Sequence, residues 1–303
     1  MRGAFREQAK FPDKRSAPGG VRPGKPALCV GKDGLFFLSP RRRKGAKNRN
    51  GCITMDSMKG LEIFEDHESL VRAAAERIAA TLAATLKEKG SATFVLTGGN
   101  TPKPIYERLA QPPYSERVPW DRVDFFWGDE RCVPPDHPDS NFGMAWKAFL
   151  SRLPVPENRI HRMLGELEDH VRAAVVYEEE IRRVTGAGDT PSFDLVLLGM
   201  GEDGHTASLF PGTLWDENRW VVANYVPKLQ STRITMTPRI LNQARAIIFI
   251  AAGSGKAQAL KDILENPESD YPGRRIRPVS GTLTWMVDRA AASLLTRAIP
   301  QGP

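Results

Sequence analysis

The chain has 303 residues, of which 41% are hydrophobic and 26% charged, and its formal net charge is +7. These values are ordinary for a globular protein, and its apolar runs are far shorter than the roughly 20 residues that cross a bilayer. Three scattered cysteines without metal-ligand spacing favour a reducing compartment over a disulfide framework. We therefore expect a cytoplasmic protein with no membrane or metal partner.

The positive charge is concentrated at the N-terminus. Residues 1–55 contain fourteen Lys or Arg and three Asp or Glu, whereas the rest of the chain contains 29 basic and 33 acidic residues. The mildly acidic remainder does not favour nucleic-acid binding. Because residues 1–57 are rich in Gly, Pro, Lys and Arg and lack periodicity, we predict a disordered basic extension followed by one domain over residues 58–303. We expect the working chain to begin near Met55 or Met58.

From residue 61 onward, strand and helix patterns alternate. Short β-branched or aromatic runs predict strands at 61–64, 92–96, 123–127, 195–198, 220–226, 233–236 and 246–251. Helical periodicity predicts helices at 69–89, 102–109, 142–150, 167–184, 256–264 and 284–295. This alternation predicts an α/β fold with a mainly parallel sheet and helices on both faces.

A glycine pair follows the predicted strand 92–96. Gly98, Gly99, Asn100 and Thr101 connect that strand to the next helix. Two glycines allow the backbone to approach a ligand closely, and a helix N-terminus favours an anion. The loop therefore suggests a phosphate cradle, and an ordinary turn capped by Thr101 is the alternative.

Charged side chains also lie at the ends of three other predicted elements. Arg131 lies just after strand 123–127, where its guanidinium could bind a phosphate or carboxylate in bidentate fashion. Asp129 and Glu130 either orient Arg131 or are solvated. Arg233 begins a strand and is a weaker candidate, whereas Lys256 at a helix start offers a point charge to a phosphate.

Residues 199–212 are the most informative segment, reading Gly-Met-Gly-Glu-Asp-Gly-His-Thr-Ala-Ser-Leu-Phe-Pro-Gly. They place Asp203 and His205 at the carboxyl end of an apolar strand, the edge at which ligands bind in open α/β sheets. A carboxylate and an imidazole can perform proton transfer near neutral pH. The segment predicts an enzyme, with a tight turn carrying a surface histidine as the alternative.

The same segment contains a second pattern. Gly199, Gly201 and Gly204 spell G-x-G-x-x-G, which is typical of dinucleotide binding. Two acidic residues would stand where the pyrophosphate should bind, and residues 219–225 lack the acidic residue expected about twenty positions later. Both observations argue against a nicotinamide cofactor.

Five motifs in order complete the pattern: Thr-Gly-Gly-Asn-Thr-Pro, Gly-Asp-Glu-Arg, Asp-Ser-Asn-Phe, Gly-Met-Gly-Glu-Asp-Gly-His and Arg-Ile-Thr-Met-Thr. Together they closely resemble the glucosamine-6-phosphate isomerase/6-phosphogluconolactonase family, over about residues 61–295. The resemblance implies a Rossmann-like fold without metal or organic cofactor. It also implies hydrolysis of 6-phospho-D-glucono-1,5-lactone to 6-phospho-D-gluconate in the oxidative pentose phosphate pathway, catalysed by the domain 58–303.

The resemblance also implies roles for individual residues. His205 would be the general base that activates water, and Asp203 would orient its imidazole or bind a sugar hydroxyl. Arg131 or backbone N–H groups of a glycine loop would stabilise the oxyanion, and which cation meets the phosphate is open. The implied substrate or phosphate contacts are Gly98, Gly99, Asn100, Thr101, Asp129, Arg131, Arg233 and Lys256.

Two other functions fit parts of the pattern. A glucosamine-6-phosphate deaminase-like isomerase of this family would have a Glu-Pro pair shortly after the loop histidine, but residues 208–211 read Ser-Leu-Phe-Pro. A non-catalytic sugar-phosphate sensor, whose basic extension contacts nucleic acid, is the other alternative. Such a sensor would need no acid and base in the loop, and the extension lacks a helix-turn-helix pattern. We expect a sugar-phosphate lactone as the small-molecule partner, no nucleic acid, and a monomer or weak homodimer.

Overall fold

A computed structural model of the chain describes residues 60–186 and 191–296. The predicted basic extension and both candidate start methionines lie outside these residues.

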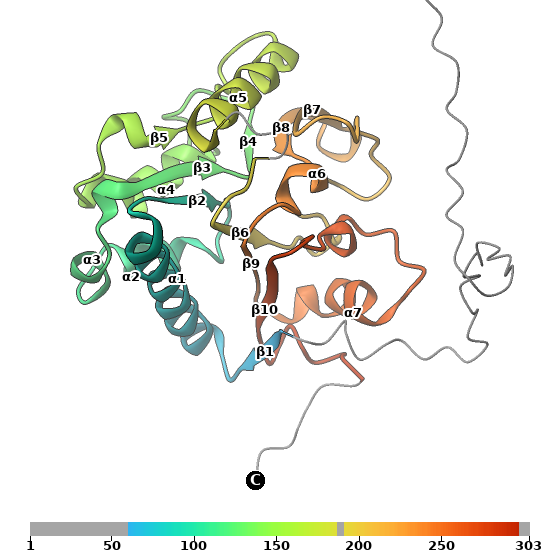
Figure 1. Ribbon diagram of the computed structural model, residues 1–303. Coiled ribbons are helices and arrows are strands. Elements are labelled where there is room, and N and C mark those ends of the chain that lie inside the picture. Colours follow the sequence, from blue (N-terminus) through green and yellow to red (C-terminus); the bar gives the residue numbers. More distant parts are fainter. Residues whose placement is uncertain (1–59, 187–190, 297–303) are drawn as a thin grey trace, which may run out of the picture. The chain divides into compact units, whose positions relative to one another are not determined.

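A seven-stranded parallel sheet forms the centre of the described domain (Figure 1). All of its strand pairs are parallel. In spatial order its strands are β1 (Leu61–Phe64), β10 (Thr282–Asp288), β9 (Ala246–Ala251), β6 (Leu195–Gly199), β2 (Ala92–Leu96), β3 (Val123–Trp127) and β5 (Ile160–His161).

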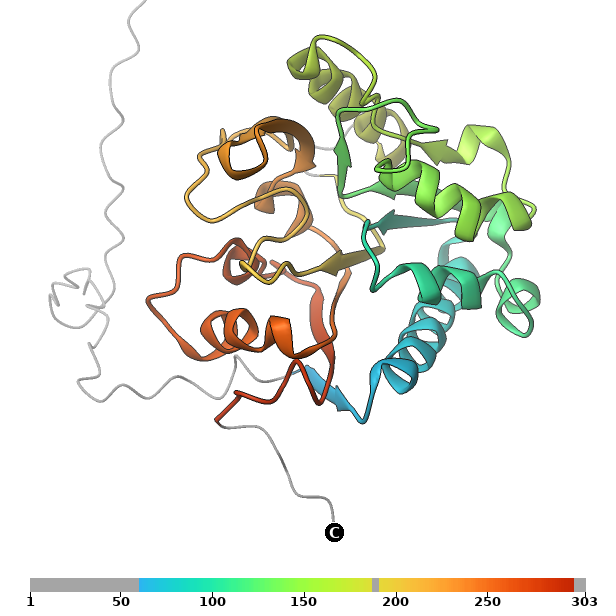
Figure 2. The ribbon, with the colours of Figure 1, turned by 180° about the vertical axis from the view of Figure 1, so that it is seen from behind.

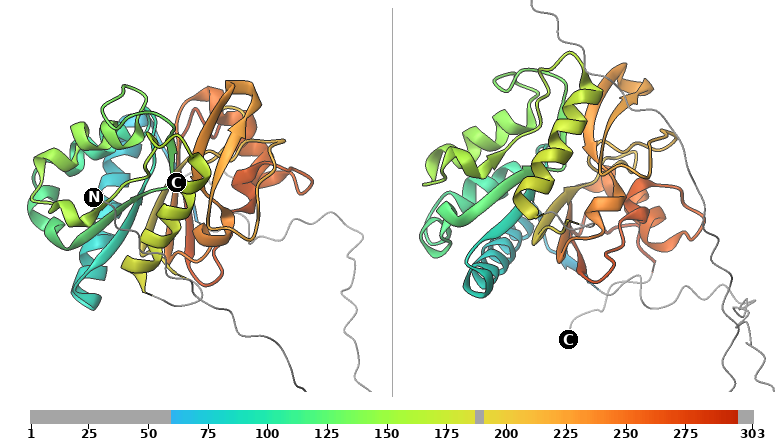
Figure 3. Two further views of the ribbon diagram at one scale, coloured as in Figure 1. Left: turned by 90° about the horizontal axis from the view of Figure 1, so that it is seen from above. Right: turned by 45° about the horizontal axis from the view of Figure 1, so that its top comes forward.

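Helices cover both faces of this sheet. Successive strand residues point to opposite faces, and both faces carry apolar side chains that must be buried. Phe125 packs in the layer that contains α1, whereas its neighbour Phe126 packs in the layer that contains α5. Figure 2 and Figure 3 show the layers from other directions. One layer contains α1 (His67–Lys89), α2 (Lys103–Leu109), α3 (Tyr114–Arg117) and α4 (Asn141–Ala148), and the other contains α5 (His170–Thr185), α6 (Pro238–Leu241) and α7 (Ala257–Glu265). The predicted α/β fold is confirmed.

Local capping explains the bounds of α1. The Asp66 side chain accepts the backbone N–H of Ser69, and the Ser69 hydroxyl accepts the backbone N–H of Asp66. This capping box starts the helix two residues before the predicted position. At the other end Gly90, with φ of 79°, ends it in the left-handed conformation that glycine favours.

A second, three-stranded antiparallel sheet lies beside the large one, with its strands in the spatial order β4 (Asp129–Arg131), β8 (Ser231–Met236) and β7 (Val221–Val226). The hairpin between β7 and β8 closes through the 3₁₀ turn Pro227–Leu229. The sequence predicted a loop at β4, because three charged residues carry no strand pattern. Their pairing with β8 places Arg131 opposite Arg233.

The predicted helix at 284–295 is wrong. Residues Thr282–Asp288 form strand β10 between β1 and β9. Trp285 and Val287 pack in the layer of α5, whereas Met286 packs in the layer of α1, which is the period of two that defines a strand. The alanines that suggested a helix follow the strand in a turn, which begins where the Asp288 carboxylate accepts the N–H of Ala291.

Within residues 60–186 and 191–296, no helix is long and apolar enough to cross a membrane.

Candidate active site

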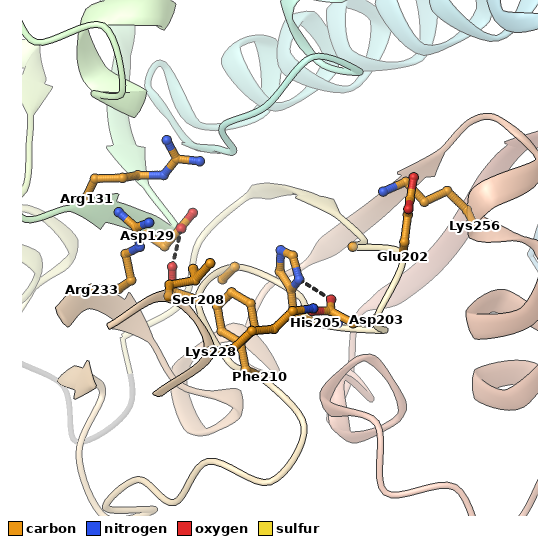
Figure 4. A pocket seen from close by; sticks show the side chains of 13 residues that line it. Asp129, Arg131, Glu202, Asp203, His205, Ser208, Phe210, Lys228, Arg233 and Lys256 are labelled. Atoms are coloured by element: carbon orange, nitrogen blue, oxygen red, sulfur yellow. Dashed lines mark hydrogen bonds and ion pairs between the residues drawn. The ribbon is translucent and has the colours of Figure 1, made fainter. Parts of the chain in front are cut away.

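Loops from the carboxyl ends of β3, β6 and β9 meet the three-stranded sheet around a cavity of about 320 Å³ (Figure 4). β6 and β2 are neighbours at the centre of the sheet, and the strand order runs outward from them in both directions. Such a reversal of strand order is where open α/β sheets bind ligands. The cavity is lined by Asp129, Arg131, Gly201, Glu202, Asp203, His205, Ala207, Ser208, Phe210, Lys228, Leu229, Arg233 and Lys256.

The cavity brings together most of the side chains that the sequence suggested. Six of them line it, namely Asp129, Arg131, Asp203, His205, Arg233 and Lys256. Gly98, Gly99, Asn100 and Thr101 are not among the lining residues. Their predicted contacts with a ligand therefore stay predictions.

His205 and Asp203 form a hydrogen-bonded pair. The His205 Nδ1 lies 2.5 Å from the Asp203 Oδ1. A carboxylate can only accept, so Nδ1 carries the hydrogen and Nε2 keeps a free lone pair. Figure 4 shows the second ring nitrogen turned away from Asp203. The imidazole also stacks on Phe210, with ring centroids 4.2 Å apart, and its side chain is 33% exposed. In its neutral form, the ring could accept a proton at Nε2.

Gly201 makes room for this pair. A Cβ at position 201 would lie 2.1 Å from the His205 Nδ1 and 2.6 Å from the Asp203 Oδ1. Only glycine fits there without displacing both side chains. The space beside this glycine is filled by the Asp203 carboxylate and the His205 ring. The structure thus gives the glycine spacing a reason other than cofactor binding.

Lys228 completes the group and was missed by the sequence analysis. Its Nζ donates to the second carboxylate oxygen of Asp203, at 2.8 Å. Desolvation raises the pKa of Asp203, but the hydrogen bonds from Lys228 and His205 outweigh it and lower that pKa to about 2. Lys228 lies at the tip of the β7–β8 hairpin in no recognisable motif, so only the tertiary fold reveals it.

Arg131 and Arg233 form a cationic wall on the opposite side of His205 from Lys256 (Figure 4). They are directly paired across β4 and β8. Burial and the charge of Arg131 lower the pKa of Arg233. Among the described residues neither arginine has an ion-pair partner, although the Arg131 Nη1 donates to the Asp139 carbonyl at 2.6 Å. Two adjacent guanidinium groups without a salt bridge are suited to an anionic ligand, although the charge of the nearby Asp129 carboxylate partly offsets that of Arg233.

Asp129 is buried in the cavity wall and held in place by neutral donors. The Ser208 hydroxyl donates to its Oδ2 at 2.6 Å, and the Asn141 Nδ2 donates to its Oδ1 at 3.3 Å and to its carbonyl at 2.9 Å. Ser208 is a second lining residue that the sequence analysis did not propose. The carboxylate is therefore a fixed acceptor at the cavity surface.

Glu130 is not solvated, and its contact with Arg131 is to the backbone, because its Oε1 accepts the Arg131 N–H at 2.8 Å. It is buried and accepts the backbone N–H groups of Asn141 at 2.7 Å and Phe142 at 2.8 Å. These are among the first N–H groups of α4, which have no partner within the helix. Burial raises the pKa of Glu130, and these backbone hydrogen bonds oppose the change. Glu130 thus anchors α4 beside the cavity.

Gly98 supports the site from outside the cavity. A Cβ at this position would lie 1.8 Å from the Asn141 Oδ1. Because Asn141 in turn holds Asp129, the absence of a side chain at Gly98 allows the Asp129 contacts to form. This gives the glycine pair after β2 a packing role that sequence reasoning did not anticipate.

Comparisons with known proteins agree on one group of enzymes. A family model described as glucosamine-6-phosphate isomerases/6-phosphogluconolactonase matches residues 65–285. A 6-phosphogluconolactonase of Synechocystis sp. is 40% identical over 242 residues, covering 78% of this chain and 98% of the relative. The chloroplastic 6-phosphogluconolactonase 3 of Arabidopsis thaliana is 36% identical over 277 residues, covering 88% of this chain and 84% of the relative. The crystal structure of 6-phosphogluconolactonase from Thermotoga maritima superposes with a TM-score of 0.66 at 33% identity, covering 76% of this chain and 99% of that one.

Proposed function

The chain belongs to the glucosamine-6-phosphate isomerase/6-phosphogluconolactonase family, and from this premise we propose that it hydrolyses 6-phospho-D-glucono-1,5-lactone to 6-phospho-D-gluconate. The observation that carries the proposal is the Asp203–His205 pair. It presents a basic nitrogen to a cavity that also contains the cations Arg131 and Arg233. Hydrolysis of a phosphorylated lactone needs both features.

In the proposed reaction, the Nε2 of His205 takes a proton from a water molecule as that water attacks the lactone carbonyl carbon. General-base catalysis of this kind contributes about 10²- to 10⁴-fold in rate. The Asp203 carboxylate stabilises the imidazolium that forms. When the tetrahedral intermediate collapses, the C–O bond to the ring oxygen breaks, and the imidazolium returns its proton to that oxygen. The resulting carboxylic acid then ionises in water.

Two charged subsites serve the two ends of the substrate. Arg131 and Arg233 lie on one side of His205, and Lys256 lies on the other (Figure 4). One subsite binds the phosphate dianion and the other stabilises the oxyanion, an effect worth about 2.7–4 kcal/mol per donor in known oxyanion holes. Substitution of each cation distinguishes the two, because losing the phosphate contact raises KM, whereas losing the oxyanion contact lowers kcat. The glycine loop 98–101 and Asp129 are proposed as further substrate contacts.

The deaminase alternative is disfavoured by one observation. Where that enzyme would have a glutamate near the loop histidine, the apolar ring of Phe210 stacks on His205 at 4.2 Å. No second carboxylate is thereby supplied to the imidazole at this position. Release of ammonia from glucosamine 6-phosphate would reverse this conclusion.

Three further parts of the proposal concern the whole protein. We propose that residues 58–303 are the catalytic domain, that the enzyme works in the cytoplasm, and that it is a monomer or weak homodimer. Activity of a chain beginning at Met58, the location of a fluorescent fusion, and light scattering test them in that order. The relative from Arabidopsis thaliana is named chloroplastic, so a fusion that enters an organelle would overturn the second part.

The deciding experiment is hydrolysis of freshly generated lactone by the wild type, His205→Ala and His67→Ala. The last variant is a control at an exposed position in the first turn of α1. After subtraction of the spontaneous reaction, we expect acceleration by the wild type and the control but not by His205→Ala. Acceleration that survives in His205→Ala would remove His205 as the base. Absence of acceleration by the wild type would overturn the lactonase.

A further inference from the structure

Both oxygens of the Asp203 carboxylate are occupied by donors from different parts of the fold. Oδ1 receives the His205 imidazole from the same loop after β6. Oδ2 receives the Lys228 ammonium from the tip of the β7–β8 hairpin, 25 residues further along the chain. Lys228 therefore links the tip of the three-stranded sheet directly to the Asp203–His205 pair.

The position of Lys228 is set by its backbone. Its turn, Pro227–Leu229, begins with a proline and is followed by Gln230 in the left-handed conformation at φ of 47°. The hairpin register continues to the last pair before the turn, Val226 opposite Ser231. These features define the backbone of the turn, from which the Lys228 side chain reaches Asp203.

Folding stability does not explain this ion pair well. The Lys228 side chain is 68% exposed, and exposed ion pairs contribute little to folding stability. Asp203 is 29% exposed and is shared with His205. We therefore expect the Lys228–Asp203 ion pair to affect mainly the His205 imidazole, which bonds to the same carboxylate.

The charges around His205 determine how Lys228 acts on it. An adjacent carboxylate favours imidazolium, and a nearby cation opposes it. Asp203 and Glu202 lie on the same loop, Lys228 on the hairpin tip, Lys256 after β9, and Asp129, Arg131 and Arg233 on β4 and β8. Lys228 bonds directly to the carboxylate that would otherwise most favour the charged ring, so it offsets that carboxylate at its source.

We propose that Lys228 is a positioning residue for the reaction: it fixes the orientation of Asp203 and keeps His205 neutral, with Nε2 able to accept a proton. This inference rests on the proposed role of His205 as the base. It assigns Lys228 no contact with the reacting atoms.

The test compares Lys228→Met, Lys228→Arg and the matched control Lys87→Met, which removes an exposed lysine from the last turn of α1. ¹⁵N-imidazole NMR titration follows His205, whose signals are assigned by their loss in His205→Ala. We expect the His205 titration midpoint to rise by about 0.5–1 pH unit in Lys228→Met, since a nearby charge is removed. Lys228→Arg should stay close to wild type, and Lys87→Met should not shift.

The kinetic readout should follow the NMR readout. The acid limb of kcat/KM should move to higher pH by the same amount, which lowers kcat/KM about 3- to 10-fold on that limb and leaves the plateau within about twofold. An unchanged titration midpoint in Lys228→Met overturns the proposal, as does a raised KM with an unmoved pH profile, which would make Lys228 a substrate contact. If the wild type does not open the lactone, the proposed function fails, and the NMR titration still decides the coupling of Lys228 to His205.

Discussion

Two histidines of this domain are hydrogen-bonded to carboxylates, and they differ in what their second ring nitrogen meets. His205 bonds to Asp203 through Nδ1, and its other nitrogen is free of protein partners among the described residues. His161 bonds to Glu180 through Nδ1 at 2.6 Å and to Asp124 through Nε2 at 3.0 Å. The His161 side chain is only 2% exposed and stacks on Phe126.

The comparison shows that a carboxylate beside a histidine does not by itself indicate catalysis. Around His161 every polar ring atom has a partner within the protein, and Arg159 and Arg183 neutralise the two carboxylates. That arrangement ties β5 to α5 and to β3. Around His205 one nitrogen is left for a molecule that the protein does not contain. The unfilled hydrogen-bonding position is the structural difference between the two histidines.

The sharpest way to break this comparison is to replace each histidine by glutamine. We expect His205→Gln to lose about 10²- to 10⁴-fold in kcat for lactone hydrolysis, because the amide cannot act as a base. Its thermal unfolding should match wild type, since the side chain is partly exposed. Retained turnover in this variant would mean that the free nitrogen is not the base.

The opposite pattern is expected for His161→Gln. Glutamine cannot replace both the buried contact to Asp124 and the part-buried contact to Glu180, so the free energy of unfolding should fall by about 1–3 kcal/mol. Chemical denaturation measures this loss, and kcat of the folded fraction should stay near wild type. A large drop in kcat without a loss of stability would show that the two histidines do not have separate roles.

A change that touches only the geometry of the reactive pair should have a smaller effect. Gly201→Ala pushes a methyl group against the His205 ring, so we expect about a tenfold loss of kcat, equivalent to about 1.4 kcal/mol. The control is Gly199→Ala, whose Cβ would meet nothing closer than the Thr97 hydroxyl at 3.8 Å. Equal activity of the two variants would contradict the packing requirement at Gly201.

The smallest effect concerns how the stability contributions of the Glu180 and Asp203 carboxylates depend on pH. The hydrogen bond from Arg183 is the largest cause that lowers the pKa of Glu180 from 4.5 to about 2. Its contribution is therefore fully present above about pH 4.5 and is lost as the pH falls toward 2. Glu180→Gln should be slightly less stable than wild type at pH 6, by a few tenths of a kcal/mol, with the difference disappearing in acid.

Asp203→Asn should be compared with Glu180→Gln. For both variants, urea denaturation at several pH values measures the free energy of unfolding. The pKa of Asp203 is also lowered to about 2, so its stability difference should narrow over the same pH range. Unlike Glu180→Gln, it should also lose lactone hydrolysis. A stability difference that grows in acid would contradict the direction of both pKa shifts.

The sequence was sufficient for most of the large sheet because its strands are buried on both faces. Runs such as 195–198 and 246–251 are apolar throughout, and the loops after such strands converge at one edge. That rule predicts that Asp203, His205 and Arg131 lie at one edge of the sheet, and all three line the cavity. The strand β10 was mistaken for a helix because its apolar residues continue into an alanine-rich turn.

The rest of the site depends on contacts between elements that are distant in sequence. Lys228 reaches Asp203 from a hairpin whose own residues carry no motif. Ser208 acts through a hydrogen bond to Asp129, 79 positions away. Strand β4 is recognisable only from its partner β8, since three charged residues have no hydrophobic period.

The packing of Gly98 against Asn141 has a consequence for how tolerance to substitution should be interpreted. In a saturation mutagenesis of this chain, position 98 should reject nearly every side chain as strictly as a position that binds substrate, although it does not line the cavity. A side chain at position 98 would displace the Asn141 amide, which in turn holds the Asp129 carboxylate. Positions at which substitution abolishes function would therefore include residues behind the cavity wall. In the loop after β2, selection would then act to keep a side chain out of the space beside Asn141.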